Sequence, residues 1–262
     1  MRGFHKQINL KRRHWYLILC IAAATIIVYI LVMSAVSTFH TIKHYNHTYT
    51  GSIQESQPEK TLSEDMEALY PELAFVRSRL ALASDDSITL SVNLHDSLLT
   101  LEYKGVVLHQ APILSIGISD FFQRLKPVAR FNLFAEVMKI ERALSTISHE
   151  PLIYRKAPKD TLEAQQTNIT PDTNLREPVF VAFYMENGIR LELTQNDPVV
   201  NTKYRKTIRD IRKRTSGDFV RSILLGKIPE YQPWIRIQTS WRDARTIYRA
   251  LPKNGKISVY YP

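Results

Sequence analysis

The chain has 262 residues, a formal net charge of +10 and a single cysteine, Cys20. With no thiol beyond Cys20, the rest of the chain excludes disulfides, cysteine-based metal sites and cysteine nucleophiles. The length allows one domain with a sizeable core plus short accessory segments.

The N-terminus has the pattern of a membrane anchor. Residues 1–14 form a basic leader with five Lys or Arg residues and no acid, and residues 15–39 contain no charged residue. A helix over 15–39 is about 37 Å long at about 1.5 Å per residue, enough to cross a hydrocarbon core of about 30 Å. We therefore predict one transmembrane helix over 15–39.

The flanking charges predict the orientation of this helix. Beyond the apolar run, only Lys43 precedes the first acid, Glu55, whereas the leader is strongly basic. The positive-inside rule keeps the leader in the cytoplasm. We therefore expect a single-pass protein of the inner (cytoplasmic) membrane with a periplasmic or extracytoplasmic domain. A cleaved signal peptide is the alternative, but its apolar region is typically only about 7–15 residues long.

The expected topology also narrows the partners. Five positive charges belong to the leader, and the remaining excess lies in the exported part. Outside the cytoplasm, a basic surface favours anionic wall polymers or lipid headgroups and disfavours nucleic acid.

Two segments connect the apolar run to the domain. Residues 40–60 are polar without an apolar period, which predicts a tether. Its histidines, His40, His44 and His47, share one face of a continued helix, but no carboxylate accompanies them, so we predict no metal. Residues 61–83 begin with a capping-box pattern and have apolar residues at helical spacing, which predicts a neck helix. Pro71 is expected to kink or divide it.

Residues 87–262 predict a mixed α/β domain, mainly β-sheet with peripheral helices. Alternating apolar residues predict antiparallel strands from Ser87 to about Ser119 and a strand pair over 179–195 with a tight turn at 186–188. Apolar residues at threes and fours predict helix over 120–149, in two halves separated by Pro127. Residues 155–177 predict a long exposed loop.

The segment 201–221 is the most basic part of the chain. Tyr204, Ile208 and Ile211 are spaced to face a core, which directs the cations to the opposite side of a helix. This candidate anion-binding face consists of Arg205, Lys206, Arg209, Arg212, Lys213 and Arg214. A solvated helix face is the alternative interpretation.

The C-terminal segment, 234–262, resembles the end of the L,D-transpeptidase catalytic domain. The similar motifs are Ile235-Arg236-Ile237, Asp243-Ala244, Ile247-Tyr248, Gly255 and Ile257-Ser258-Val259-Tyr260. Earlier segments follow in the family's order, with 91–117 similar to its opening hairpin and 188–191 similar to the Gly-Ile-x-Ile before its catalytic His-Gly. The resemblance implies an L,D-transpeptidase-like domain over 87–262 and no cofactor.

The positions that carry catalysis in that family differ here. Trp234 stands at the position of the Cys nucleophile and Glu192 at that of the His, and an indole cannot be acylated. The resemblance therefore implies a pseudoenzyme that binds peptidoglycan or scaffolds envelope proteins. Arg190 and Arg236 are the candidates for gripping a carboxylate, since a guanidinium fork matches its geometry.

Several alternatives stay open at this stage. Glu192 could pair with Asp197 or Asp243 to act on a glycosidic bond, or it could be an ion-pair partner of Arg190, Arg236 or the basic segment 201–221. Trp234 could stack on a sugar or fill a vacated cleft. The other function classes are a protein-only interaction component of an envelope complex and an active peptidoglycan-modifying enzyme with non-cysteine chemistry.

Overall fold

A computed structural model describes residues 4–51, 64–149, 177–196, 204–206, 208–210, 221–223 and 225–262. Within these residues, nine strands form one sheet in the order β3-β2-β1-β9-β5-β6-β7-β8-β4. The strands are β1 (Ile88–Asn93), β2 (Leu98–Tyr103), β3 (Val106–Pro112), β4 (Ser115–Ile118), β5 (Met138–Ser145), β6 (Phe180–Met185), β7 (Arg190–Gln195), β8 (Trp234–Thr239) and β9 (Lys256–Tyr260). The described helices are α1 (Phe4–Gly51), α2 (Glu64–Ala83), the 3₁₀ helix η1 (Phe122–Arg124), α3 (Pro127–Ala135) and α6 (Trp241–Ala250). The mixed α/β class, dominated by sheet, is confirmed.

The two edges of the sheet are consecutive in the chain. β3 pairs with β2 at one edge and β4 pairs with β8 at the other, and only Ile113 and Leu114 separate β3 from β4. The backbone N–H of Ile113 donates to the carbonyl of Ser97, and that of Leu114 to the carbonyl of Gln238. The two edges of the sheet therefore meet at one corner, at Ile113 and Leu114, where β3 leads into β4.

The predicted hairpins form where the sequence has its turn residues. Lys104 and Gly105 both have positive φ, +51° and +79°, as a two-residue type I′ turn requires. The hairpin of β6 and β7 turns at Glu186-Asn187-Gly188, where Gly188 has a φ of +81°. The prediction of a strand pair over 179–195 is confirmed.

The prediction of helix over 120–149 is wrong after Ala135. η1 and α3 lie within 122–135, with Pro127 beginning α3, but residues 138–145 form β5. Met138 and Ile140 are buried while Lys139 and Glu141 are exposed, so this short stretch follows the two-residue period of a strand. The long loop expected at 155–177 lies outside the described residues apart from Glu177.

α1 replaces the first part of the predicted tether. The helix continues without a break to Gly51, and the side chains of Ser37 and Tyr45 are buried against the domain. Ser37 donates a hydrogen bond to the carbonyl of Pro229, and Tyr45 donates one to the carbonyl of Asn187. The polar residues of 40–51 are thus the outer side of an amphipathic helix and no flexible spacer. Residues 52–60 lie outside the described part.

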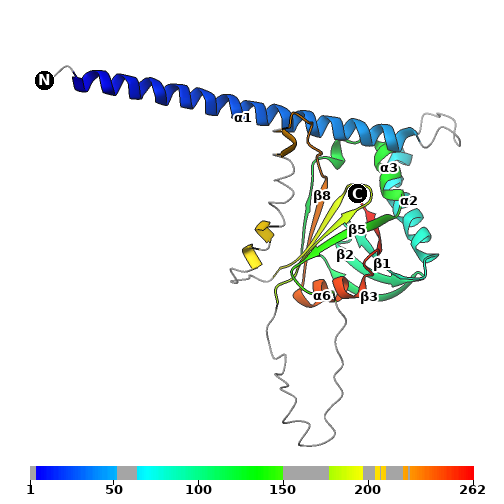
Figure 1. Cartoon of the computed structure of the whole chain (residues 1–262). Coiled ribbons are helices and arrows are strands. Elements are labelled where there is room, and N and C mark those ends of the chain that lie inside the picture. The colour runs from blue at the N-terminus through cyan, green and yellow to red at the C-terminus, as the bar shows by residue number, and fades with distance from the viewer. Residues whose placement is uncertain are drawn as a thin grey trace, which may run out of the picture.

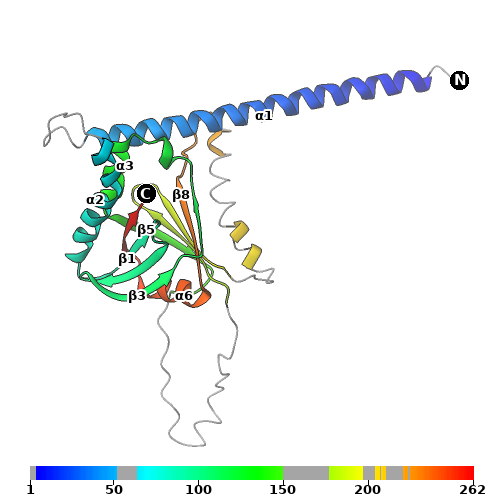
Figure 2. The ribbon, with the colours of Figure 1, turned by 180° about the vertical axis from the view of Figure 1, so that it is seen from behind.

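The two halves of α1 have different surroundings. Its C-terminal half lies across one end of the sheet, and its N-terminal half projects beyond the domain (Figure 1, Figure 2). α6 lies at the opposite end of the sheet. Among the described residues, α1 is the one helix long and apolar enough to cross a membrane, and its apolar window is not buried inside the protein.

α2 agrees with the predicted neck helix, although Pro71 does not divide it. It packs on α3 and β9 through Ala74, Phe75, Ser78 and Leu82, all buried. Four of the apolar residues that predict this helix from the sequence, Leu69, Leu73, Val76 and Leu80, do not form that contact and are between 55% and 74% exposed.

Candidate functional site

The four candidate site residues meet on the outer face of two adjacent strands. In β7 and β8, Leu191, Leu193, Ile235 and Ile237 point into the core, so the residues between them point outward. The strands are parallel, and their register pairs Arg190 with Trp234 and Glu192 with Arg236. The structure therefore brings together Arg190, Glu192, Trp234 and Arg236.

Glu192 forms the centre of this group. Nε of Arg236 donates to Oε2 of Glu192 at 2.8 Å, and Nε of Arg190 lies 3.2 Å from Oε1. The Glu192 side chain is only 1% exposed, against 12% for Arg190 and 34% for Arg236. The carboxylate that the two guanidinium groups contact is thus the protein's own, and the ion-pair interpretation of Glu192 fits this geometry.

Glu192 is buried although it lies outside the main core. The residue paired with Glu192 on the adjacent strand β6 is Ala182, which packs in a second apolar cluster with Phe180 and Tyr184. Tyr204 and Ile208 pack against that cluster from the basic segment. This cover lies over β6, next to Glu192 in the sheet, and limits the access of water to this part of the outer face.

The basic segment agrees with its predicted orientation where it is described. Tyr204 and Ile208 face the sheet, whereas Arg205, Lys206 and Arg209 are exposed. Three members of the candidate anion-binding face, Arg212, Lys213 and Arg214, lie outside the described residues.

Trp234 lies over a glycine on the neighbouring strand. The register of β4 and β8 pairs Gly117 with Arg236, and a Cβ on Gly117 would come within 3.3 Å of Cζ3 of Trp234. The Arg236 guanidinium lies over the indole, with its Cζ 4.9 Å from the ring centroid. Gly117 thus leaves space for the indole, and Arg236 links it to Glu192.

A cavity of about 290 Å³ opens beside Trp234, between the domain and α1. It is lined by Thr38, Ile118, Ser119, Asp120, Phe121, Arg124, Tyr231 and Trp234. Ser119 and Tyr231 share a hydrogen bond of 2.7 Å between their hydroxyl groups, and Asp120 and Arg124 are exposed. The cavity offers aromatic surface together with one charge of each sign. Sequence reasoning missed Asp120 and Arg124 because they lay in a segment interpreted as an ordinary core helix.

A second polar group lies at the start of α6. Nε2 of His109 is 2.9 Å from Oδ1 of Asp243, and Oγ of Ser240 donates to Oδ2 of Asp243 at 2.6 Å. Ser, His and Asp are thus close together, which the sequence did not reveal for His109. Nucleophilic catalysis requires the imidazole to contact the hydroxyl, but here the carboxylate contacts both.

Asp197, the other acid considered beside Glu192, lies outside the described residues.

Ser240 has a structural role as the N-cap of α6, since its Oγ accepts from the backbone N–H of Asp243. We expect Ser240→Ala to lower the free energy of unfolding by about 1 kcal/mol because that N–H loses its partner. Urea unfolding of the full chain in detergent, followed by circular dichroism, measures this loss. Ser115→Ala, at an exposed strand position, is the matched control and should change stability by less than about 0.5 kcal/mol. Equal stability of the two variants would contradict the capping role.

The three histidines of the former tether segment lie on the exposed side of α1. Among the described residues, no three His, Cys, Asp or Glu side chains gather as metal ligands would.

Comparison of the chain with protein-family models, curated proteins and solved structures gave no match.

Proposed function

We propose that this protein is a membrane-anchored, exported binding or scaffolding module of the cell envelope, without catalytic activity. α1 crosses the inner membrane once, with the leader in the cytoplasm and the sheet domain outside it. The basic leader and the long apolar helix support this arrangement. Ser37 is already buried by the domain, so the membrane-spanning part of α1 ends before that residue. The domain therefore lies close to the bilayer surface.

The observation that carries the non-catalytic assignment is the closed ion-pair group on the outer face. Glu192 binds both Arg190 and Arg236, and Arg236 is stacked on Trp234. A general acid or base needs access to a reacting atom, and the Glu192 side chain is 1% exposed. These contacts support a structural role for Glu192.

Kinship with L,D-transpeptidases is part of the proposal. It is supported by the position of the two motif segments, because Gly188-Ile189-Arg190-Leu191 leads into β7 and Ile235-Arg236-Ile237 lies on β8. These strands are adjacent and parallel, so the residues aligned with the family's His and Cys, Glu192 and Trp234, are near neighbours in the sheet. In this chain those two positions hold no thiol and no imidazole.

The cavity beside Trp234 is the proposed ligand site. Peptidoglycan combines sugar rings with stem peptides that carry both carboxylate and amino groups. Trp234 and Tyr231 offer aromatic surface for a sugar, and Arg124 and Asp120 offer one partner for each type of charge. The Arg190 and Arg236 guanidinium groups are already engaged by Glu192, so Arg124 takes over the role expected of them.

Retention on purified sacculi tests this site. We expect the full chain in detergent to bind, and Trp234→Ala and Arg124→Gln to weaken binding by about tenfold or more, as central contacts of a small site do. The matched control is Lys253→Gln, an exposed cation after α6 outside the lining of this cavity, which should bind as the wild type does. No retention above a heat-denatured sample would contradict peptidoglycan binding.

The other two classes predict different results. A protein-only interaction component would give crosslinks to envelope proteins in cells and no adducts with muropeptides. An active enzyme would produce crosslinked or exchanged products from tetrapeptide muropeptides, and such products would overturn the proposal.

A further inference from the structure

α2 carries an apolar stripe that faces away from the domain. Its members are Leu69, Leu73, Val76 and Leu80, with exposed fractions of 59%, 55%, 56% and 74%. Their spacing alternates between four and three residues. This 3.5-residue average is the repeat by which one helix packs along another.

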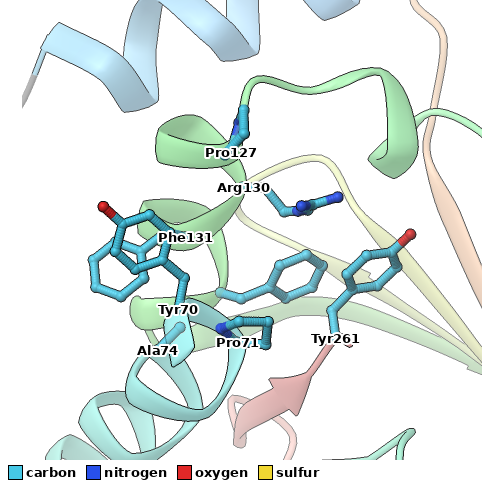
Figure 3. Close-up of a pocket in the computed structure, with 8 residues that line it drawn as sticks. Tyr70, Pro71, Ala74, Pro127, Arg130, Phe131 and Tyr261 are labelled. Atoms are coloured by element: carbon cyan, nitrogen blue, oxygen red, sulfur yellow. The ribbon is translucent and has the colours of Figure 1, made fainter. Parts of the chain in front are cut away.

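The domain contacts the opposite side of α2. Ala74, Phe75, Ser78 and Leu82 are buried there, and Tyr70, Pro71 and Ala74 face α3 and Tyr261 (Figure 3). The remaining space at this contact is about 20 Å³, little more than one water molecule requires. Burial raises the pKa of Tyr261. α2 is thus fully docked through one side, and the stripe is additional to that contact.

The charges of α2 are arranged for pairing with a copy of itself. Glu72 and Arg77 are exposed, whereas Arg79 pairs with Glu102 of the same domain at 2.6 Å. If two copies run antiparallel about the middle of the stripe, Glu72 of each lies level with Arg77 of the other. The stripe is symmetric in the same sense, since Leu69 would lie level with Leu80 of the other copy and Leu73 with Val76.

We propose that the protein forms a homodimer in which the α2 helices of two copies pack antiparallel through Leu69, Leu73, Val76 and Leu80. The proposal does not depend on peptidoglycan binding, because the stripe and the cavity beside Trp234 consist of different residues.

Light scattering of the full chain in detergent tests the dimer. We expect the wild type to be dimeric at micromolar concentration, and Leu73→Glu combined with Val76→Glu to be monomeric, with dissociation at least about 100-fold easier. Both residues are more than half exposed, so the variant should keep its circular dichroism spectrum and unfolding midpoint. The matched control is Val106→Glu on β3, where Val106 is 64% exposed, and it should remain dimeric.

Disulfide trapping tests the direction of packing. In a Cys20→Ser background, chains with Leu69→Cys and chains with Leu80→Cys, carrying different tags, should form a mixed disulfide when combined. Either variant alone should crosslink much less, because antiparallel packing separates identical positions by about 16 Å at about 1.5 Å per residue. A monomeric wild type, a dimer that survives the double glutamate substitution, or crosslinking only between identical positions would each overturn the proposal.

Discussion

Glu192→Ala is expected to destabilise the domain by about 3 kcal/mol, because removing one member of a buried ion-pair group leaves charges without compensation. Arg190 and Arg236 would both lose the carboxylate they contact, and the Arg190 side chain is only 12% exposed. Urea unfolding of the full chain in detergent, followed by near-ultraviolet circular dichroism, measures the effect. Because Arg236 also stacks on Trp234, the signal of that indole should change in the folded state as well.

A surface ion pair at the turn of the same hairpin provides the control. Glu186 contacts Lys139 at 2.7 Å, but its side chain is 53% exposed. Exposed pairs of this kind contribute about 0–1 kcal/mol, so Glu186→Ala should have a small effect. If Glu192→Ala were as mild as Glu186→Ala, the carboxylate would not be a structural centre, and its assignment as a ligand-contacting residue would have to be reopened.

Tyr45→Ala is expected to cost about 3 kcal/mol and to detach the end of α1 from the sheet domain. Tyr45 is 8% exposed, its ring lies 5.0 Å from that of Phe121, and its hydroxyl donates to the carbonyl of Asn187. Loss of a buried aromatic ring leaves a cavity that the surroundings fill only in part. Trypsin cleavage at the nearby Lys43 should become much faster than in the wild type, and the unfolding midpoint should fall.

The neighbouring exposed residue provides a matched control for Tyr45. His44 lies on the outer side of the same helical turn, so His44→Ala should change stability by less than about 0.5 kcal/mol. A silent Tyr45→Ala would mean that residues 40–51 act as the spacer that their polar composition predicted.

Elements with one strong local signal could be predicted from the sequence. The apolar run, the neck helix and the hairpins at Lys104-Gly105 and Glu186-Asn187-Gly188 depend on length, period and turn residues within a short window. The strand β5 was interpreted as helix because apolar residues in Met138–Ser145 also match a helical spacing when joined to the preceding segment. Its pairing with β6 and β9, which are distant in the chain, decides the outcome.

The candidate site shows the same division. Arg190, Glu192, Trp234 and Arg236 were grouped from the sequence through a resemblance, and strand register brings them together. The sequence did not predict that both arginines contact Glu192. This contact arises because all three side chains lie on the outer face of β7 and β8. The direction of the α2 stripe could not be predicted either, because an amphipathic pattern does not tell which partner its apolar side contacts.

In the proposed topology, the unbroken course of α1 joins the membrane-spanning part rigidly to the folded domain. In thicker or thinner membranes a transmembrane helix adjusts its tilt, and α1 has no break that would absorb that change before Ser37 and Tyr45 contact the domain. Each degree of tilt would then turn the whole sheet by the same amount, so lipid composition would set how the outer face is presented to its surroundings.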